Sequence, residues 1–162
     1  MAEDETVSYF IVGLIGTFRI MDKRYNGLVG DLKTMAQFVF IYEKQIRFIN
    51  KNHEFQELFP DAYRNYEQKI KKHLRYDKAG YLKEAILDKK VGKYTTLAFT
   101  KNKIMIVDLC RHIRNAICHA SLYKKRDKLF IEDMNSSQVA SSFGYIEYPA
   151  IKEFFVAIIR EF

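Results

Sequence analysis

The segment LCRHIRNAICHA, residues 109–120, joins an apolar helical stripe to a polar opposite face. On a helical wheel the stripe lies within about 60° of Ile113 and contains Ile106, Leu109, Ala116, Ile117 and Ala120. The other face carries two arginines, two histidines and an asparagine. The segment therefore predicts an amphipathic helix that packs on a core and presents groups able to hold phosphate and transfer protons.

Helical spacing extends over most of the remaining chain. Apolar residues from Leu32 to Ile49 recur at intervals of 3 and 4, which predicts a long central helix with Asp31 as its N-cap. Prolines at positions 60 and 149 suit the first turn of a helix. We therefore expect helices over residues 6–18, 32–49, 60–74, 81–87, from Thr95 or Thr96 through Ala120, and 149–162.

A short β element is expected after the segment 109–120. Residues 121–133 (SLYKKRDKLFIED) place apolar pairs on both sides of a charged turn, as in a β-hairpin, and residues 135–144 have the composition of a loop. The length fits one domain, residues 1–162. The expected fold class is all-α: an antiparallel helical bundle with a short β-hairpin after the helix containing residues 109–120.

The distribution of charge indicates a polyanionic partner. Residues 61–130 contain 18 basic and 7 acidic side chains, whereas the rest of the chain contains 9 and 13. Such a basic middle region is typical of a surface that faces nucleic acid, although a solvated lysine-rich helix surface has the same composition. The basic block includes the segment 109–120, which favours a functional surface.

The apolar segments and the cysteine spacing predict the compartment of the protein and its relation to membranes. The uncharged run of residues 6–18 is shorter than the roughly 20 residues of a membrane span, and the acidic N-terminus is unlike a signal peptide. Cys110 and Cys118 are about 12 Å apart along a helix, too far for a disulfide. We expect reduced thiols and a cytoplasmic protein without a membrane partner.

The residues Arg114-Asn115-Ala116-Ile117-Cys118-His119 resemble the Arg-x4–6-His motif of HEPN domains, in which a polar residue often follows the arginine. The order of motif helix, short hairpin and final helix also resembles that family. Its members are small helical bundles, usually dimeric, and many are metal-independent endoribonucleases in toxin–antitoxin, abortive-infection and RNA-processing systems. The resemblance covers the C-terminal two fifths of the chain well and the remainder only as a helical pattern.

The resemblance implies specific roles for three residues. Arg114 would hold and stabilise the phosphate, His119 would act as general acid or base, and Asn115 would order the site. By charge and position, the expected RNA-binding residues are Arg111, His112, Lys124, Lys125 and Arg126. Two simpler interpretations remain open: His119 as a helix-end residue bound to terminal carbonyls, and Arg111 as an ion-pair partner of Asp108.

The predicted function is RNA cleavage through attack of a ribose 2′-hydroxyl, without a metal or other cofactor. The expected partners are RNA, a second copy of the chain in a homodimer, and an antitoxin protein. The alternative is a non-catalytic HEPN module that binds nucleotides, RNA or a protein. A dimerisation domain with an incidental basic face is a third interpretation. Cys118 is not expected to be a nucleophile, because the sequence places no base beside it.

Overall fold

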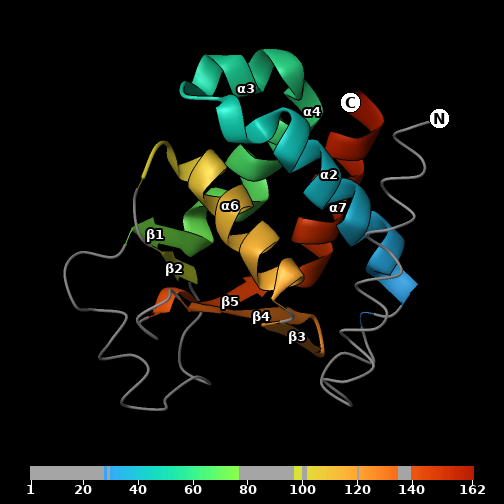
Figure 1. Cartoon of the computed structure of the whole chain (residues 1–162), viewed down its shortest axis with the longest axis vertical. Helices are drawn as coiled ribbons and strands as arrows, with labels where there is room; N and C mark the ends of the chain where they lie inside the picture. Colours follow the sequence, from blue (N-terminus) through green and yellow to red (C-terminus); the bar gives the residue numbers. More distant parts are fainter. Residues whose placement is uncertain (1–27, 29, 77–96, 100–101, 120, 135–139) are drawn as a thin grey trace.

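The structure is a computed structural model that describes residues 28, 30–76, 97–99, 102–119, 121–134 and 140–162. The predicted helices over residues 6–18 and 81–87 and the predicted cap at Thr95 or Thr96 lie outside these residues. Most of the described residues are helical, as expected, and the helices lie over one face of a β-sheet (Figure 1). None of the helices in the described part of the chain combines the length and apolar character that crossing a bilayer requires.

Helix α2 (Leu32–Lys44) forms where the spacing predicts it but is shorter than predicted. The backbone leaves helical geometry at Gln45, with φ −140° and ψ −53°, and a single 3-10 turn, η2 (Ile46–Phe48), follows. Ile46 and Ile49 are nevertheless buried. The periodicity therefore identified the buried side chains correctly, whereas the turn at Gln45 ends the helix.

Helix α4 (Pro60–Asn65) begins at the predicted proline. Its first amides are capped from the other end of the chain, because the backbone N–H groups of Asp61 and Ala62 donate to the Glu161 carboxylate at 3.0 and 2.9 Å. A carboxylate there satisfies amides without a helical partner and favours the helix dipole. The other helical segments between α2 and the sheet are α3 (Asn52–Leu58), the π-helix η3 (Tyr66–Ile70) and the 3-10 turn η4 (Lys71–His73).

The described strands form one sheet in the order β1-β2-β5-β4-β3. Strands β1 and β2 are parallel, and the other neighbours are antiparallel. The strands are β1 (Leu74–Tyr76), β2 (Leu97–Phe99), β3 (Leu122–Lys125), β4 (Lys128–Met134) and β5 (Ala140–Glu147). The predicted hairpin is confirmed as β3–β4, but it forms one edge of a larger sheet.

The segments that join the sheet outside the hairpin were therefore predicted wrongly. Leu74, expected at the end of the helix over residues 60–74, belongs to β1. Residues 140–144, expected in a loop, belong to β5, and residues 97–99, expected in a helix, form β2. Strand β5 pairs on one side with β2 and on the other with β4, so its structure depends on distant segments rather than on its own small side chains. For the described residues, the expectation of an all-α fold with only a hairpin is corrected to a mostly helical fold with a five-stranded sheet.

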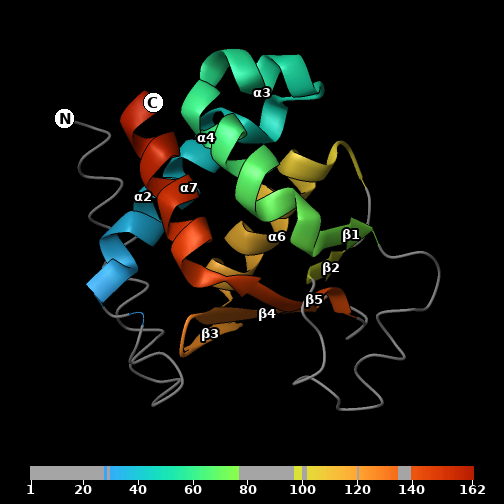
Figure 2. The ribbon, with the colours of Figure 1, turned by 180° about the vertical axis from the view of Figure 1, so that it is seen from behind.

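The core lies between this sheet and the helices α2, α6 (Met105–Cys118) and α7 (Tyr148–Glu161). Helix α7 begins at the second predicted proline turn, and Figure 2 shows it beside α4. The rings of Phe38 and Phe155 join α2 to α7 with centroids 4.5 Å apart. The predicted apolar stripe of α6 is confirmed at Ile106, Leu109, Ile113, Ala116 and Ile117, which are all fully buried, whereas Ala120 lies outside the described residues.

Candidate functional site

The C-terminal end of α6 places His119 at the surface. The helix ends at Cys118, and His119 is the C-cap residue with φ −95° and ψ 3°. Its backbone N–H donates to the carbonyl of Asn115 at 2.9 Å, which closes the last turn. Because His119 follows the helix and is exposed, its imidazole is accessible to a ligand from solvent.

Arg114 and Asn115 are in direct contact. The Arg114 guanidinium donates from Nη1 to Oδ1 of Asn115 at 2.7 Å. Its guanidinium carbon lies 5.9 Å from the centre of the Tyr42 ring on α2. About a third of the Arg114 side chain is exposed. The arginine is thus held in one orientation while part of it still faces solvent.

Glu43 is a site residue that the sequence analysis missed. Its Oε1 lies 2.6 Å from Nη2 of Arg114, and its Oε2 lies 2.9 Å from Nη1 of Arg47. Glu43 is the one acidic residue within α2, and it directly follows the buried residue Tyr42. That isolated charge was the available signal, but its pairing with α6 depends on how the two helices pack.

The Arg114 guanidinium has unused hydrogen-bonding capacity. Its Nε is buried and has no hydrogen-bond partner among the described residues. An arginine held by Glu43 and Asn115 can bind an anion by exchanging the carboxylate for a phosphate oxygen, because both ligands fit the planar fork of donors. The nearby thiol of Cys118 is a weak candidate for chemistry, since burial raises its pKa despite the neighbouring Arg114 charge.

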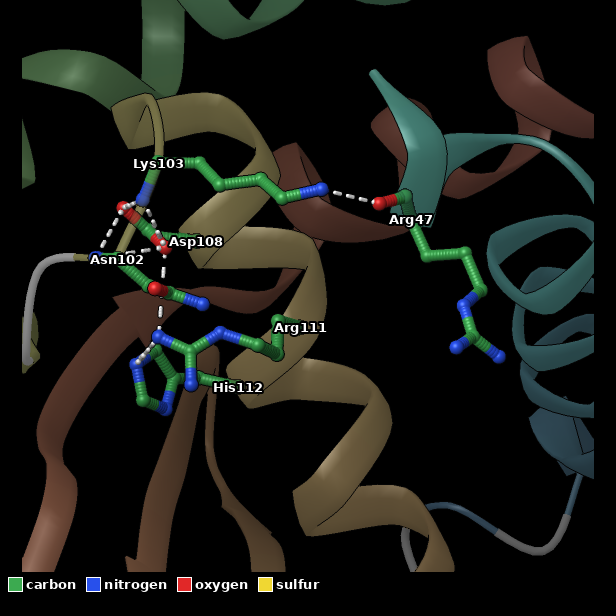
Figure 3. A network of polar contacts seen from close by, with 6 residues as sticks. All are labelled: Arg47, Asn102, Lys103, Asp108, Arg111 and His112. Carbon is green, nitrogen blue, oxygen red and sulfur yellow. Dashed lines mark hydrogen bonds and ion pairs between the residues drawn. The ribbon is translucent and has the colours of Figure 1, made fainter. Parts of the chain in front are cut away.

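Arg111 and His112 belong to a different, mostly buried network (Figure 3). Nη2 of Arg111 lies 3.3 Å from Oδ1 of Asp108 and 3.2 Å from Nε2 of His112. The Asp108 carboxylate also accepts the backbone N–H groups of Asn102 and Lys103 at 3.2 Å. Of the two interpretations of Arg111, an RNA contact or an ion pair with Asp108, the ion pair is confirmed.

The location of His112 conflicts with its predicted role in RNA binding. His112 and Asp108 are completely buried, and the His112 ring lies 5.4 Å from the ring of Phe99 on β2. Burial, the charge of Asp108 and a hydrogen bond to Asp108 together raise the pKa of Tyr76 to about 12. A side chain without exposed surface cannot contact RNA in this conformation, so His112 is not among the RNA contacts proposed below.

The three predicted cations of the hairpin are divided by the sheet. Lys124 lies on the side of α7, with Nζ 4.8 Å from the centre of the Tyr148 ring.

Asp31 occupies the predicted N-cap position of α2 but makes no side-chain capping bond, because its carboxylate binds Tyr148 and Lys152 instead. Burial raises the pKa of Asp31, but these hydrogen bonds outweigh it and hold the pKa below its ordinary value.

Lys125 and Arg126 instead line a separate hollow at the hairpin turn, together with Lys128 and Tyr145. The predicted residues therefore lie in four places: the Arg114–Asn115–His119 segment with Glu43, the buried Asp108 network, Lys124 beside α7, and the hollow at the hairpin turn. Within the described part of the chain, no three acidic, histidine or cysteine side chains are grouped as metal ligands.

Comparisons with known proteins add no assignment. No family model matches the chain, and no curated protein or solved structure does so either.

Proposed function

We propose that this protein is a metal-independent endoribonuclease of the HEPN type. The observation that carries the proposal is the end of α6 at Cys118, which leaves His119 exposed one turn beyond the paired Arg114 and Asn115. This arrangement puts a proton-transferring group and a fixed cation on adjoining turns of one helix. It supports the roles that the motif resemblance implies.

In the proposed reaction, a ribose 2′-oxygen attacks the adjacent phosphorus atom and the bond from phosphorus to the 5′-oxygen breaks. The products are a 2′,3′-cyclic phosphate and a 5′-hydroxyl. His119 either removes the proton of the 2′-hydroxyl or donates one to the leaving 5′-oxygen, and solvent water takes up or supplies the other proton. Arg114 neutralises charge that develops on the phosphoryl oxygens, and Asn115 orients the guanidinium.

The wider proposal follows the same resemblance. It comprises a cytoplasmic homodimer in which each chain is one domain with the antiparallel helical bundle of the family. It also includes a role in a toxin–antitoxin or phage-defence system with an antitoxin protein as partner. The two free cysteines, Cys110 and Cys118, support a reducing compartment.

Cleavage that survives chelation is the direct test of this function. The purified protein should cut a mixed single-stranded RNA pool at an unchanged rate in excess EDTA, because the proposed residues need no metal to activate the 2′-hydroxyl. The products should carry cyclic phosphates, which acid treatment or mass spectrometry identifies. Loss of cleavage in EDTA and its recovery with added Mg²⁺ would show that the mechanism is wrong.

Glu43 should restrain RNA binding, because it occupies the donors that a phosphate needs. Replacing it by glutamine keeps a hydrogen-bond acceptor for Arg114 but removes the negative charge. A partly exposed ion pair contributes up to about 1 kcal/mol, so Glu43→Gln should tighten RNA binding about two- to fivefold. Fluorescence anisotropy at low salt measures the change. Glu57→Gln, an exposed change on α3, is the matched control, and equal effects of both variants would contradict a specific role for Glu43.

One observation favours the non-catalytic alternative. Arg114 is already neutralised by Glu43 at 2.6 Å, as expected for a structural ion pair in a module that binds RNA without cutting it. The two functions differ in the chelation experiment, since a silent module binds the RNA pool but leaves it intact. In the silent module, His119 would be a helix-end residue.

A further inference from the structure

A hollow of about 540 Å³ opens at the turn of the β3–β4 hairpin. This volume falls within the range of about 300–1,000 Å³ found for small-ligand sites. Its walls belong to three adjacent strands and their turn, and they carry three cationic and two acidic side chains beside one aromatic ring. The lining residues are Lys125, Arg126, Asp127, Lys128, Tyr145 and Glu147.

The cations are placed where they repel one another. Lys125 and Lys128 are direct partners across the antiparallel pair β3–β4, a position in which like charges are unfavourable. Glu147 is the partner of Lys128 on β5 and offsets part of this repulsion. Arg126 adds a third positive charge and Asp127 a second negative one, so three cations face two carboxylates and an anion bound at the hollow would offset the excess positive charge.

The turn also holds Arg126 in an unfavourable backbone conformation. Its φ of 57° lies in the left-handed region, where glycine and asparagine are far more common than a long side chain. The charge repulsion and this φ are two independent local costs at one turn. Features that reduce stability in this way are expected at binding sites, where the ligand compensates for them.

Tyr145 supplies a different kind of contact. It is half-buried on β5, where it pairs with Phe130 and packs against that ring at a centroid distance of 5.0 Å. The aromatic pair fixes the orientation of the tyrosine at the wall of the hollow. Cations beside a fixed aromatic ring are the combination that holds single-stranded nucleic acid, with phosphates on the cations and a base on the ring.

We propose that this hollow binds one nucleotide of single-stranded RNA, with its phosphate between Arg126 and the two lysines and its base stacked on Tyr145. The inference rests on the proposed ribonuclease function and assigns the hollow to a nucleotide that flanks the cleaved bond. Arg126 lies seven positions after His119, so their Cα atoms are at most ~25 Å apart. A short RNA segment therefore reaches both places.

The test uses a short single-stranded RNA with 2′-O-methyl riboses, which the protein cannot cut by 2′-hydroxyl attack. Arg126→Gly should weaken binding about tenfold and flatten its salt dependence, yet raise the melting temperature, because glycine tolerates the left-handed backbone. These opposite changes distinguish lost binding from lost folding. Lys51→Gln is the charge-matched control; Lys51 precedes α3, at the opposite end of the molecule from the hairpin (Figure 1).

Variants of Tyr145 separate base stacking from charge attraction. Tyr145→Phe should bind as the wild type does, whereas Tyr145→Leu, which keeps an apolar side chain but lacks a ring face, should bind about tenfold more weakly. Inorganic polyphosphate serves as a second probe that has no base. Its binding should depend on Arg126 and remain unchanged in Tyr145→Leu.

Equal RNA binding by Tyr145→Leu and the wild type would overturn the nucleotide site. So would equal losses for RNA and polyphosphate in that variant. Neither result affects the chelation experiment, because cleavage depends on Arg114 and His119. Conversely, a protein that never cuts RNA but shows the expected binding changes would refute the ribonuclease and retain the nucleotide site.

Discussion

His119→Ala is expected to lower the rate of RNA cleavage about 10²- to 10⁴-fold, the usual contribution of a general acid or base. Arg114→Ala should cause a loss of about 10²- to 10³-fold, because it would remove the donor proposed to stabilise the phosphoryl oxygens. Single-turnover cleavage of a defined RNA measures both rates. The exposed residues His53 and Arg64, on α3 and α4, provide matched alanine controls that should keep full activity.

Two further measurements prevent a folding defect from being taken for lost catalysis. His119→Ala should bind uncleavable RNA with an affinity within about threefold of the wild type. The proposed role of the imidazole is proton transfer in the reaction, so its loss should slow cleavage without weakening RNA binding. Arg114→Lys keeps a positive charge beside Glu43 but loses the planar guanidinium and its paired N–H donors. This variant should therefore remain folded and still cleave RNA slowly. Full cleavage by the His119 variant would remove that residue from the mechanism.

The same variants show whether the proposed homodimer shares its site. If each site combines Arg114 of one chain with His119 of the other, co-refolding the two alanine variants restores one intact pair in every mixed dimer. Random assortment then returns about a quarter of the wild-type activity. Mixed dimers that are proven by mass spectrometry and remain inactive would contradict the shared site but leave both residues as candidates within one chain.

Asp108→Ala is expected to reduce the free energy of unfolding by about 3–5 kcal/mol, the usual cost of removing one partner of a buried ion pair. The substitution leaves the amides of Asn102 and Lys103 without their acceptor and Arg111 without its counter-charge. Urea denaturation followed by circular dichroism measures the loss.

The surface residue Asp61 provides the comparison for Asp108. Its carboxylate pairs with Arg64 and Arg160 at 3.3 and 3.1 Å, and the side chain is 45% exposed. Asp61→Ala should cost less than about 1 kcal/mol, because exposed ion pairs are screened by water. Similar losses for the two variants would mean that the Asp108 network does not stabilise the fold.

Local patterns were sufficient for much of the helical structure. The apolar stripe of α6 is buried as predicted, and the helices that begin at the two prolines and the β3–β4 hairpin are all present. Each of these features depends on residues close together in sequence, through helical periodicity, the fixed φ of proline or a short turn. The end of this helix was expected at Ala120, whereas α6 ends at Cys118, just before His119.

Local sequence patterns did not predict the exposure of residues that a distant segment covers. A helical wheel placed Asp108 and His112 on the polar side of α6, but it carries no information about neighbouring elements. In the structure, the loop at Asn102 and Lys103 and the strand residue Phe99 cover that side. Polar residues on one helix face are exposed only where no other element packs against them.

By itself, the sequence determined the helical character of the chain, its buried apolar stripes and the position of Arg114, Asn115 and His119 at the end of one helix. Only the tertiary structure decided that Glu43 contacts Arg114, that β5 lies between β2 and β4, and that the basic hairpin residues are divided between two faces. The physical reason is the range of the interactions. Helical periodicity and turns act over a few residues, whereas ion pairs between helices and hydrogen bonds between strands depend on packing of the whole chain.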